Sequence, residues 1–142
     1  MTSPVPPPPH PLDYTLATST LDGPRGPIVV VVAGGDLDIV AHDALAAALT
    51  DTGTRGDVIL DATAVTFCSS AIIGLVHTVH RRLAAAGHRL VLATEAHALR
   101  RPLHLLRLDR VLTITGDVAA ARARLDRAAT DQPEPAAIDS DG

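Results

Sequence analysis

The segment IVVVVAG, residues 28–34, is an almost unbroken run of β-branched apolar residues. Such a run predicts a strand buried on both faces, and a strand of that kind belongs to a sheet with other elements packed against it. Soon after this strand the period of the pattern changes from two to about 3.6. A helix is therefore expected to follow GGDLD, starting at Asp38, with one apolar face formed by Val40, Ala44, Leu45, Ala48 and Leu49.

The same change of period recurs along the chain. Further strands are predicted at residues 13–20, 57–63, 88–94 and 111–115, and further helices at residues 72–83, 99–106 and 117–129. Gly and Pro residues between residues 21 and 27 predict a hairpin-like connection between the first two strands. The expected fold class is α/β in the order β-β-α-β-α-β-α-β-α, a mixed, mostly parallel sheet with helices packed against it and one antiparallel pair at its N-terminal edge.

The length of 142 residues fits one domain with tails. Residues 1–11 contain six prolines and predict a disordered, extended tail. Residues 128–142 are small, acidic and proline-containing, and they are also expected to be disordered. The folded domain is therefore predicted over residues 12–127.

Composition excludes several classes of function. The net charge is -4, the arginines are scattered, and aromatic residues make up 1% of the chain, so nucleic-acid binding is not expected. The single cysteine, Cys68, allows neither an internal disulfide nor a cysteine zinc site, and its apolar context predicts an inert thiol. No apolar run reaches the roughly 18 residues of a membrane helix and no signal-peptide pattern is present, which favours a cytoplasmic protein that does not engage a membrane.

Chemistry-bearing motifs are also scarce. His77 and His80 are three residues apart on a predicted helix, but no third ligand accompanies them, so a metal site is not expected and both are expected on the outer side of the helix. Dinucleotide, phosphate-loop and hydrolase-elbow motifs are missing from the sequence. The sequence thus predicts a protein that is not an enzyme, carries no cofactor and acts by binding.

Four segments in a fixed order carry a resemblance to a known family. They are GDLD before the first helix, DATAVTF followed by serines, GHRLVLA, and LDRVLTI. The chain resembles a STAS domain over roughly residues 12–127, and in particular the bacterial anti-sigma factor antagonists. The resemblance implies a partner, an anti-sigma factor with serine kinase activity and a histidine-kinase-like ATPase fold, whose capture releases a sigma factor. It also implies that phosphorylation of a serine at the start of the second helix breaks this complex.

The family motif at that helix reads approximately Phe-Met/Cys-Asp-Ser-Ser-Gly-Leu. Phe67, Cys68, Ser70 and Ile73 match it, whereas Ser69 replaces the aspartate and Ile72 replaces the glycine. Ala71 stands where the phosphorylated serine normally lies, and alanine has no hydroxyl group to modify. The usual phosphoserine switch therefore cannot operate at this position.

Three interpretations of Ser69 and Ser70 stay open. The serines are helix caps whose hydroxyl oxygen accepts a hydrogen bond from the first turn, or one of them replaces the missing phosphoacceptor, since a helix N-terminus accommodates a phosphate. In the third interpretation the domain binds its partner constitutively. The partner-binding residues implied are Asp38, Ser69, Ser70, Ala71 and Ile72, with Asp38 also expected to cap the first helix.

Other assignments concern neighbouring residues and other functions. Asp61, which the resemblance places at the end of the third strand, is expected to arrange the loop that follows it. Alternative functions are a STAS scaffold or sensor domain in a signalling complex, and a domain that binds a small anion or nucleotide at the N-terminus of the second helix. The edge of the first strand would allow pairing with a second copy, a homodimer that the sequence neither favours nor opposes.

Overall fold

The computed structural model describes residues 14–51 and 56–131. Its centre is a five-stranded sheet in the order β1-β2-β3-β4-β5. Strands β1 (Tyr14–Gly23) and β2 (Gly26–Leu37) form an antiparallel hairpin at one edge. Strands β3 (Asp57–Cys68), β4 (Leu90–Ala93) and β5 (Thr113–Thr115) continue the sheet in parallel. The predicted mixed sheet with one antiparallel pair at its N-terminal edge is confirmed.

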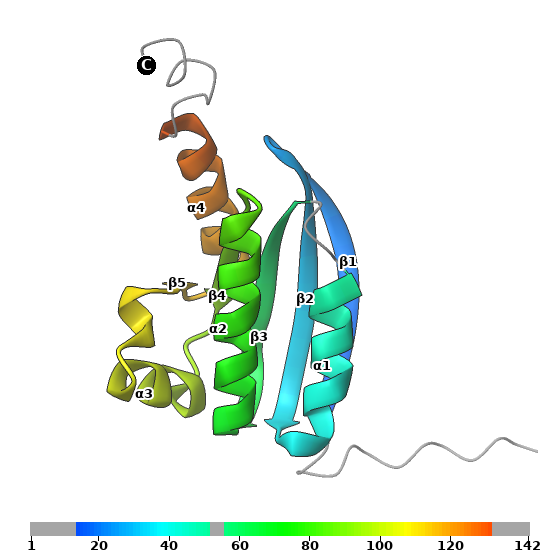
Figure 1. Cartoon of the computed structure of the whole chain (residues 1–142), viewed down its shortest axis with the longest axis vertical. Helices are drawn as coiled ribbons and strands as arrows, with labels where there is room; N and C mark the ends of the chain where they lie inside the picture. Colours follow the sequence, from blue (N-terminus) through cyan, green and yellow to red (C-terminus); the bar gives the residue numbers. More distant parts are fainter. Residues whose placement is uncertain (1–13, 52–55, 132–142) are drawn as a thin grey trace, which may run out of the picture.

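The helices alternate with the strands as predicted. They are α1 (Ile39–Asp51), α2 (Ser70–Ala85), α3 (His97–Leu105) and α4 (Val118–Asp131), and a short 3₁₀ turn η1 (Leu108–Arg110) precedes β5. In Figure 1, α1 and α2 lie side by side along the sheet, and their first turns lie at the end where β2 finishes. Both helices therefore present their N-termini at the same end of the molecule.

Alternate residues of the central strands point to two separate cores, as the period of a strand requires. Val58, Leu60, Leu90 and Leu92 pack with the buried residues of α1, α2 and α3. Ile59, Val91 and Ala93 pack on the opposite face with α4, through Ala121 and Leu125. The parallel register that pairs Val58 with Leu90 keeps each set on one side of the sheet.

Strands β2 and β3 are longer than the sequence pattern predicts. Strand β2 continues through Gly34 and Gly35 to Leu37, and β3 continues past Asp61 to Cys68. The register between them shifts twice, between Val32 and Gly34 and again between Gly35 and Asp36, where β3 carries an extra residue each time. Such bulges interrupt a ladder without ending it, which is why the local pattern suggested shorter strands.

One prediction about α1 is wrong in detail. Its buried stripe consists of Ala41, Leu45 and Leu49, whereas Val40 is 72% exposed. Val40 lies one position before the stripe, on the side of the first turn that faces away from the sheet. The helix itself, and its start immediately after Asp38, are as predicted.

The predicted ends of two other helices are confirmed by their hydrogen bonds. The Asp117 carboxylate accepts a bond from the Ala120 amide at 2.7 Å and so caps α4. Gly87, with φ +83°, follows the last turn of α2, and the His88 amide donates to the Leu83 carbonyl at 2.8 Å. This is the Schellman arrangement, which glycine favours because it lacks a Cβ.

The predicted Pro-rich tail, residues 1–11, lies outside the described residues, as does the part of the predicted acidic tail from residue 132 onward. Helix α4 extends to Asp131, beyond the domain boundary predicted at residue 127. Over residues 14–51 and 56–131, every helix is too short or too polar to span a bilayer.

Candidate functional site

The carboxyl ends of β2 and β3 bring the starts of α1 and α2 together. Leu37 and Cys68 are partners in the register between these strands. One residue further on, the Ser69 amide donates a hydrogen bond of 3.0 Å to the Leu37 carbonyl. The segment around Asp38 therefore lies beside the first residues of α2, although about thirty positions separate them in the sequence.

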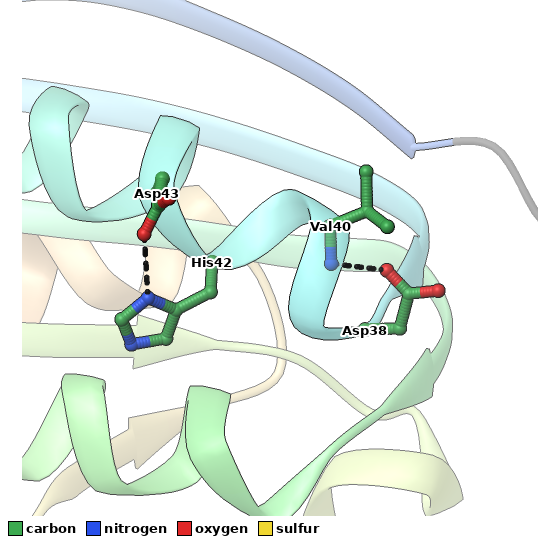
Figure 2. Close-up of polar contacts among 4 residues, drawn as sticks. All are labelled: Asp38, Val40, His42 and Asp43. Atoms are coloured by element: carbon green, nitrogen blue, oxygen red, sulfur yellow. Dashed lines mark hydrogen bonds and ion pairs between the residues drawn. The ribbon is translucent and has the colours of Figure 1, made fainter.

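Asp38 holds the first turn of α1 in place. Its Oδ1 atom accepts a hydrogen bond of 2.9 Å from the Val40 amide (Figure 2). This is the N-cap interaction predicted from the sequence, and it satisfies one of the amides that a helix start leaves without a partner. Figure 2 also shows His42 beside Asp43, a pair 3.3 Å apart at the surface, where such contacts contribute little to stability.

Ser69 occupies the N-cap position of α2, but it does not cap the helix with its side chain. The residue is in an extended conformation, and its hydroxyl group makes no capping hydrogen bond. The Oγ atom is buried and has no hydrogen-bond partner among the described residues. The capping role predicted for this hydroxyl is therefore wrong, and the Ser69 carbonyl, which accepts from the Ile72 and Ile73 amides, holds the turn instead.

The three residues after Ser69 differ in how accessible they are to solvent. Ser70 and Ala71, the first two residues of α2, are exposed. Ile72 is 1% exposed and belongs to the core beneath α2. Ile72 was predicted to contact a partner, but its side chain is not accessible to one in this conformation, because the apolar stripe of α2 begins there.

Three exposed apolar side chains belong to the two segments that meet at this turn, and the sequence interpretation did not include them in the site. Ile39 is 76% exposed, Val40 72% and Phe67 50%. Ile39 and Val40 follow Asp38 directly, and Phe67 lies two residues before Ser69. One feature of the sequence could have identified Ile39 and Val40 as exposed. These two β-branched residues precede the Ala41, Leu45 and Leu49 stripe and therefore do not belong to the buried face of the helix.

Two acidic residues lie in the strands that lead to the site. Asp36 is 6% exposed, pairs in register with Phe67, and its Oδ1 atom has no hydrogen-bond partner within the described part of the chain. Asp61 lies inside β3 and not at its end, and its Oδ1 accepts from the Thr63 amide at 3.0 Å and from the Thr63 hydroxyl at 2.7 Å. Asp61 thus shapes the bulged segment of the strand that follows it.

Cys68 is not available as a nucleophile. It is half-buried, and its Sγ donates a long contact of 3.6 Å to the Ser69 carbonyl. Burial raises the pKa of the Cys68 thiol from its ordinary value of 9.0 to about 12. The reactive thiolate is therefore scarce at neutral pH, in agreement with the inert thiol expected from the sequence.

The histidine pair of α2 faces inward more than expected. His77 and His80 are both half-buried, although the sequence placed them on the outer side of the helix. Burial, with a smaller contribution from His77, lowers the pKa of His80 below its ordinary value. Across residues 14–51 and 56–131, no three His, Cys, Asp or Glu side chains cluster closely enough to hold a metal ion.

The chain matches a family model described as "Mlab, STAS domain" over residues 24–116, which is more than half of its length. It belongs to the STAS domain family. The match spans β2 through β5 and includes both helix starts of the candidate site. The family resemblance of the sequence motifs is therefore confirmed, whereas no curated protein sequence matches the chain significantly.

Several solved structures share this STAS fold. An anti-sigma factor antagonist from Mycobacterium paratuberculosis superimposes with a TM-score of 0.73 at 23% identity, covering 82% of this chain and 97% of that one. The anti-sigma factor antagonist SpoIIAA in its unphosphorylated form gives a TM-score of 0.58 at 25% identity, covering 76% and 96% of the two chains. The phosphorylated form of the Bacillus cell fate determinant SpoIIAA gives 0.56 at 22% identity, covering 74% and 96%.

Proposed function

We propose that this STAS domain is an anti-sigma factor antagonist, which binds an anti-sigma factor with serine kinase activity in the cytoplasm and so releases a sigma factor. The contact region is the surface formed by Asp38, Ile39, Val40, Phe67, Ser70 and Ala71, called here the α1–α2 surface. The domain acts by binding, without catalysis of its own. Its similarity to solved anti-sigma factor antagonists supports this role.

The observation that carries the proposal is the exposure of Ile39, Val40 and Phe67 beside Ser70. Burying one such side chain in an interface contributes about 1.5–3 kcal/mol. Exposed apolar side chains gathered at one place on a monomer commonly mark a protein-binding surface. Asp38 and the Ser70 hydroxyl supply polar groups at the same surface, which adds specificity to the apolar contacts.

Ser70 is the better candidate of the two serines for a phosphorylation switch. Its side chain is exposed at the first position of α2, whereas the Ser69 hydroxyl is buried. A phosphate on Ser70 would lie at a helix N-terminus that has no side-chain cap, where free amides and the helix dipole favour an anion. The domain would stay folded, while about -1.5 to -2 charges would be added among the apolar contact residues.

The binding test compares three proteins as bait in the native host: the unmodified chain, Val40→Asp and Leu105→Asp. Leu105, on α3, is 68% exposed and makes a matched control, because the same change is introduced away from the α1–α2 surface. We expect the unmodified chain and Leu105→Asp to recover an ATPase-type anti-sigma factor, identified by mass spectrometry, and Val40→Asp to lose it. Equal recovery of the anti-sigma factor by all three proteins would reject the α1–α2 surface as the contact region. Partners that include no such factor would contradict the antagonist function and favour the scaffold alternative.

The switch is tested with the recovered kinase, ATP and intact-mass measurement. We expect one phosphate on the unmodified chain, located at Ser70, and none on Ser70→Ala. The variant Ala71→Ser restores a hydroxyl at the position that the family usually phosphorylates, and it serves as a positive control for kinase activity. Modification of Ala71→Ser but not of the unmodified chain would reject Ser70 as acceptor and leave constitutive binding.

A further inference from the structure

A pocket of about 250 Å³ lies at the end of the molecule opposite the α1–α2 surface. It is formed by the turn of the β1–β2 hairpin, the last turns of α2, the segment leading into β4, and the start of β5. The nearest lining residue on helix α2, His80, follows Ser70 by ten positions, which is about 15 Å along the helix. In Figure 1 this is the end where β1 and β2 meet in their hairpin.

Four basic side chains line this pocket: Arg25, His80, His88 and Arg89. They come from three separate segments of the sequence, so the fold alone assembles them. No acidic residue is among the described residues that line the pocket. Two guanidinium groups, always charged, and two imidazoles therefore surround one small cavity.

Two of the segments that line the pocket are tied to the surrounding structure by hydrogen bonds. Arg25 donates a hydrogen bond to the Gly87 carbonyl, which ties the hairpin turn to the end of α2. The buried carboxylate of Asp57 accepts from the Arg89 amide at 2.9 Å and lies 3.9 Å from His88 Nδ1. Asp57 thus fixes the backbone of the segment that carries His88 and Arg89.

Two ring nitrogens at the pocket have unmet hydrogen-bonding capacity. His80 Nδ1 and His88 Nδ1 are buried and have no hydrogen-bond partner among the described residues. The contact of 3.9 Å between His88 and Asp57 is too long for a hydrogen bond. Buried polar atoms without partners are uncommon, because leaving them unpaired is costly. Both Nδ1 atoms are closed to solvent in this conformation, so a ligand with several acceptor oxygens would bond to the guanidinium groups first and would reach these atoms only after the rings rotate.

The carboxyl end of α2 disfavours an anion, since the helix dipole places a partial negative charge near the pocket. The dipole corresponds to about half an elementary charge, which is less than the full charge of the Arg89 guanidinium group. The Schellman bonds at Leu83 and Ala84 further engage the carbonyls of this helix end. The field in the pocket therefore remains favourable to an anion.

We propose that this pocket binds a small phosphate-bearing anion, with Arg89 as its main charged contact and Arg25, His80 and His88 as additional donors. Arginine matches the geometry of phosphate oxygens with two parallel hydrogen bonds. The volume is below that of typical pockets for drug-sized ligands, and it suits inorganic phosphate, pyrophosphate or a compact phosphate ester. The site is separate from the α1–α2 surface and goes beyond antagonist function.

The test is a titration of the full chain with pyrophosphate and with inorganic phosphate, followed by amide chemical shifts in NMR spectra. We expect saturable shifts of the Gly87, His88 and Arg89 amides, and a loss of affinity of about tenfold or more in Arg89→Gln. Arg101→Gln is the matched control, since it removes the same charge from an exposed position on α3, and its affinity should stay within about twofold. Thermal unfolding of each variant in ligand-free buffer checks that it folds.

Three results would overturn the proposal. The first is the absence of saturable shifts up to high millimolar concentrations of both anions. The second is an equal loss of affinity in Arg89→Gln and Arg101→Gln, which would indicate attraction by overall charge only. The third is saturable shifts confined to the Ser70 and Ala71 amides, which would place anion binding at the N-terminus of α2.

Discussion

The Ser69 amide donates a hydrogen bond of 3.0 Å to the carbonyl oxygen of Leu37, and this bond joins the last residue of β2 to the start of α2. Through it, the first turns of α1 and α2 share one surface. Asp38 caps one of these turns with its carboxylate, while Ser69 leaves the other without a side-chain cap. The two helix starts therefore differ in how they depend on their side chains, and two predictions follow from this difference.

The variant Asp38→Ala should lower the free energy of unfolding by about 0.5–2 kcal/mol, because it removes the hydrogen bond to the Val40 amide. Urea unfolding monitored by circular dichroism measures the change. Asp43→Ala is the control, since the Asp43 side chain is fully exposed and pairs with His42 at the surface, and it should change stability by less than about 0.5 kcal/mol. An effect of Asp38→Ala no larger than that of Asp43→Ala would mean that the cap contributes nothing.

The variant Ser69→Ala should be neutral or slightly stabilising, in contrast to the loss of about 1 kcal/mol that is usual for an N-cap serine. The Ser69 hydroxyl makes no capping bond and is buried without a partner, so removing it eliminates a desolvation cost and no hydrogen bond. The same urea experiment gives the answer. A loss comparable to that of Asp38→Ala would show that the hydroxyl caps α2 in solution.

Cys68 should make the protein less stable as the pH rises above about 9. Burial raises the folded-state pKa of its thiol to about 12, so between pH 9 and 12 the unfolded chain loses this proton while the folded chain keeps it. Unfolding then releases a proton, and its free energy falls with increasing pH. Denaturant midpoints measured across this range should decline less steeply in Cys68→Ala than in the unmodified chain.

A thiol reagent provides a separate check on Cys68. In native buffer at pH 8 the reagent should modify the thiol slowly, and in urea it should modify it at the rate of an unfolded cysteine, since only the thiolate reacts. Equal rates in both conditions, together with the same alkaline decline in both proteins, would show that Cys68 is not protected by burial.

The architecture of this domain could be predicted from the sequence because the patterns that indicate strands, helices and helix ends are local. The change between a strand period and a helix period sets the element order, and the caps at Asp38 and Asp117 and the glycine after α2 set helix ends. Each of these features depends on residues within a few positions of one another. The strand ends were predicted too short because the bulges in β3 depend on its pairing with β2, which is not a local property.

In the candidate site, too, the features that depend on local sequence were predicted, and those that depend on packing were not. The motif located the turn at residues 67–73, but it did not distinguish an exposed Ser70 from a buried Ser69 hydroxyl or place Ile72 in the core. These outcomes depend on how α2 rotates to bury its stripe against the sheet. Val40 illustrates the same point on α1, since a position that fits a helical face by spacing lies outside it once the helix packs.

The sequence by itself thus determined the family, the order of strands and helices, and the location of the turn before α2. Only the tertiary structure decided which side chains at that turn are accessible, and only it brought Arg25 to His80, His88 and Arg89 in a single pocket. The hydrophobic period of a segment and the capping of a helix depend on residues within one or two helical turns. The exposure of a side chain and its contacts with distant residues depend on packing between elements that are far apart in the sequence.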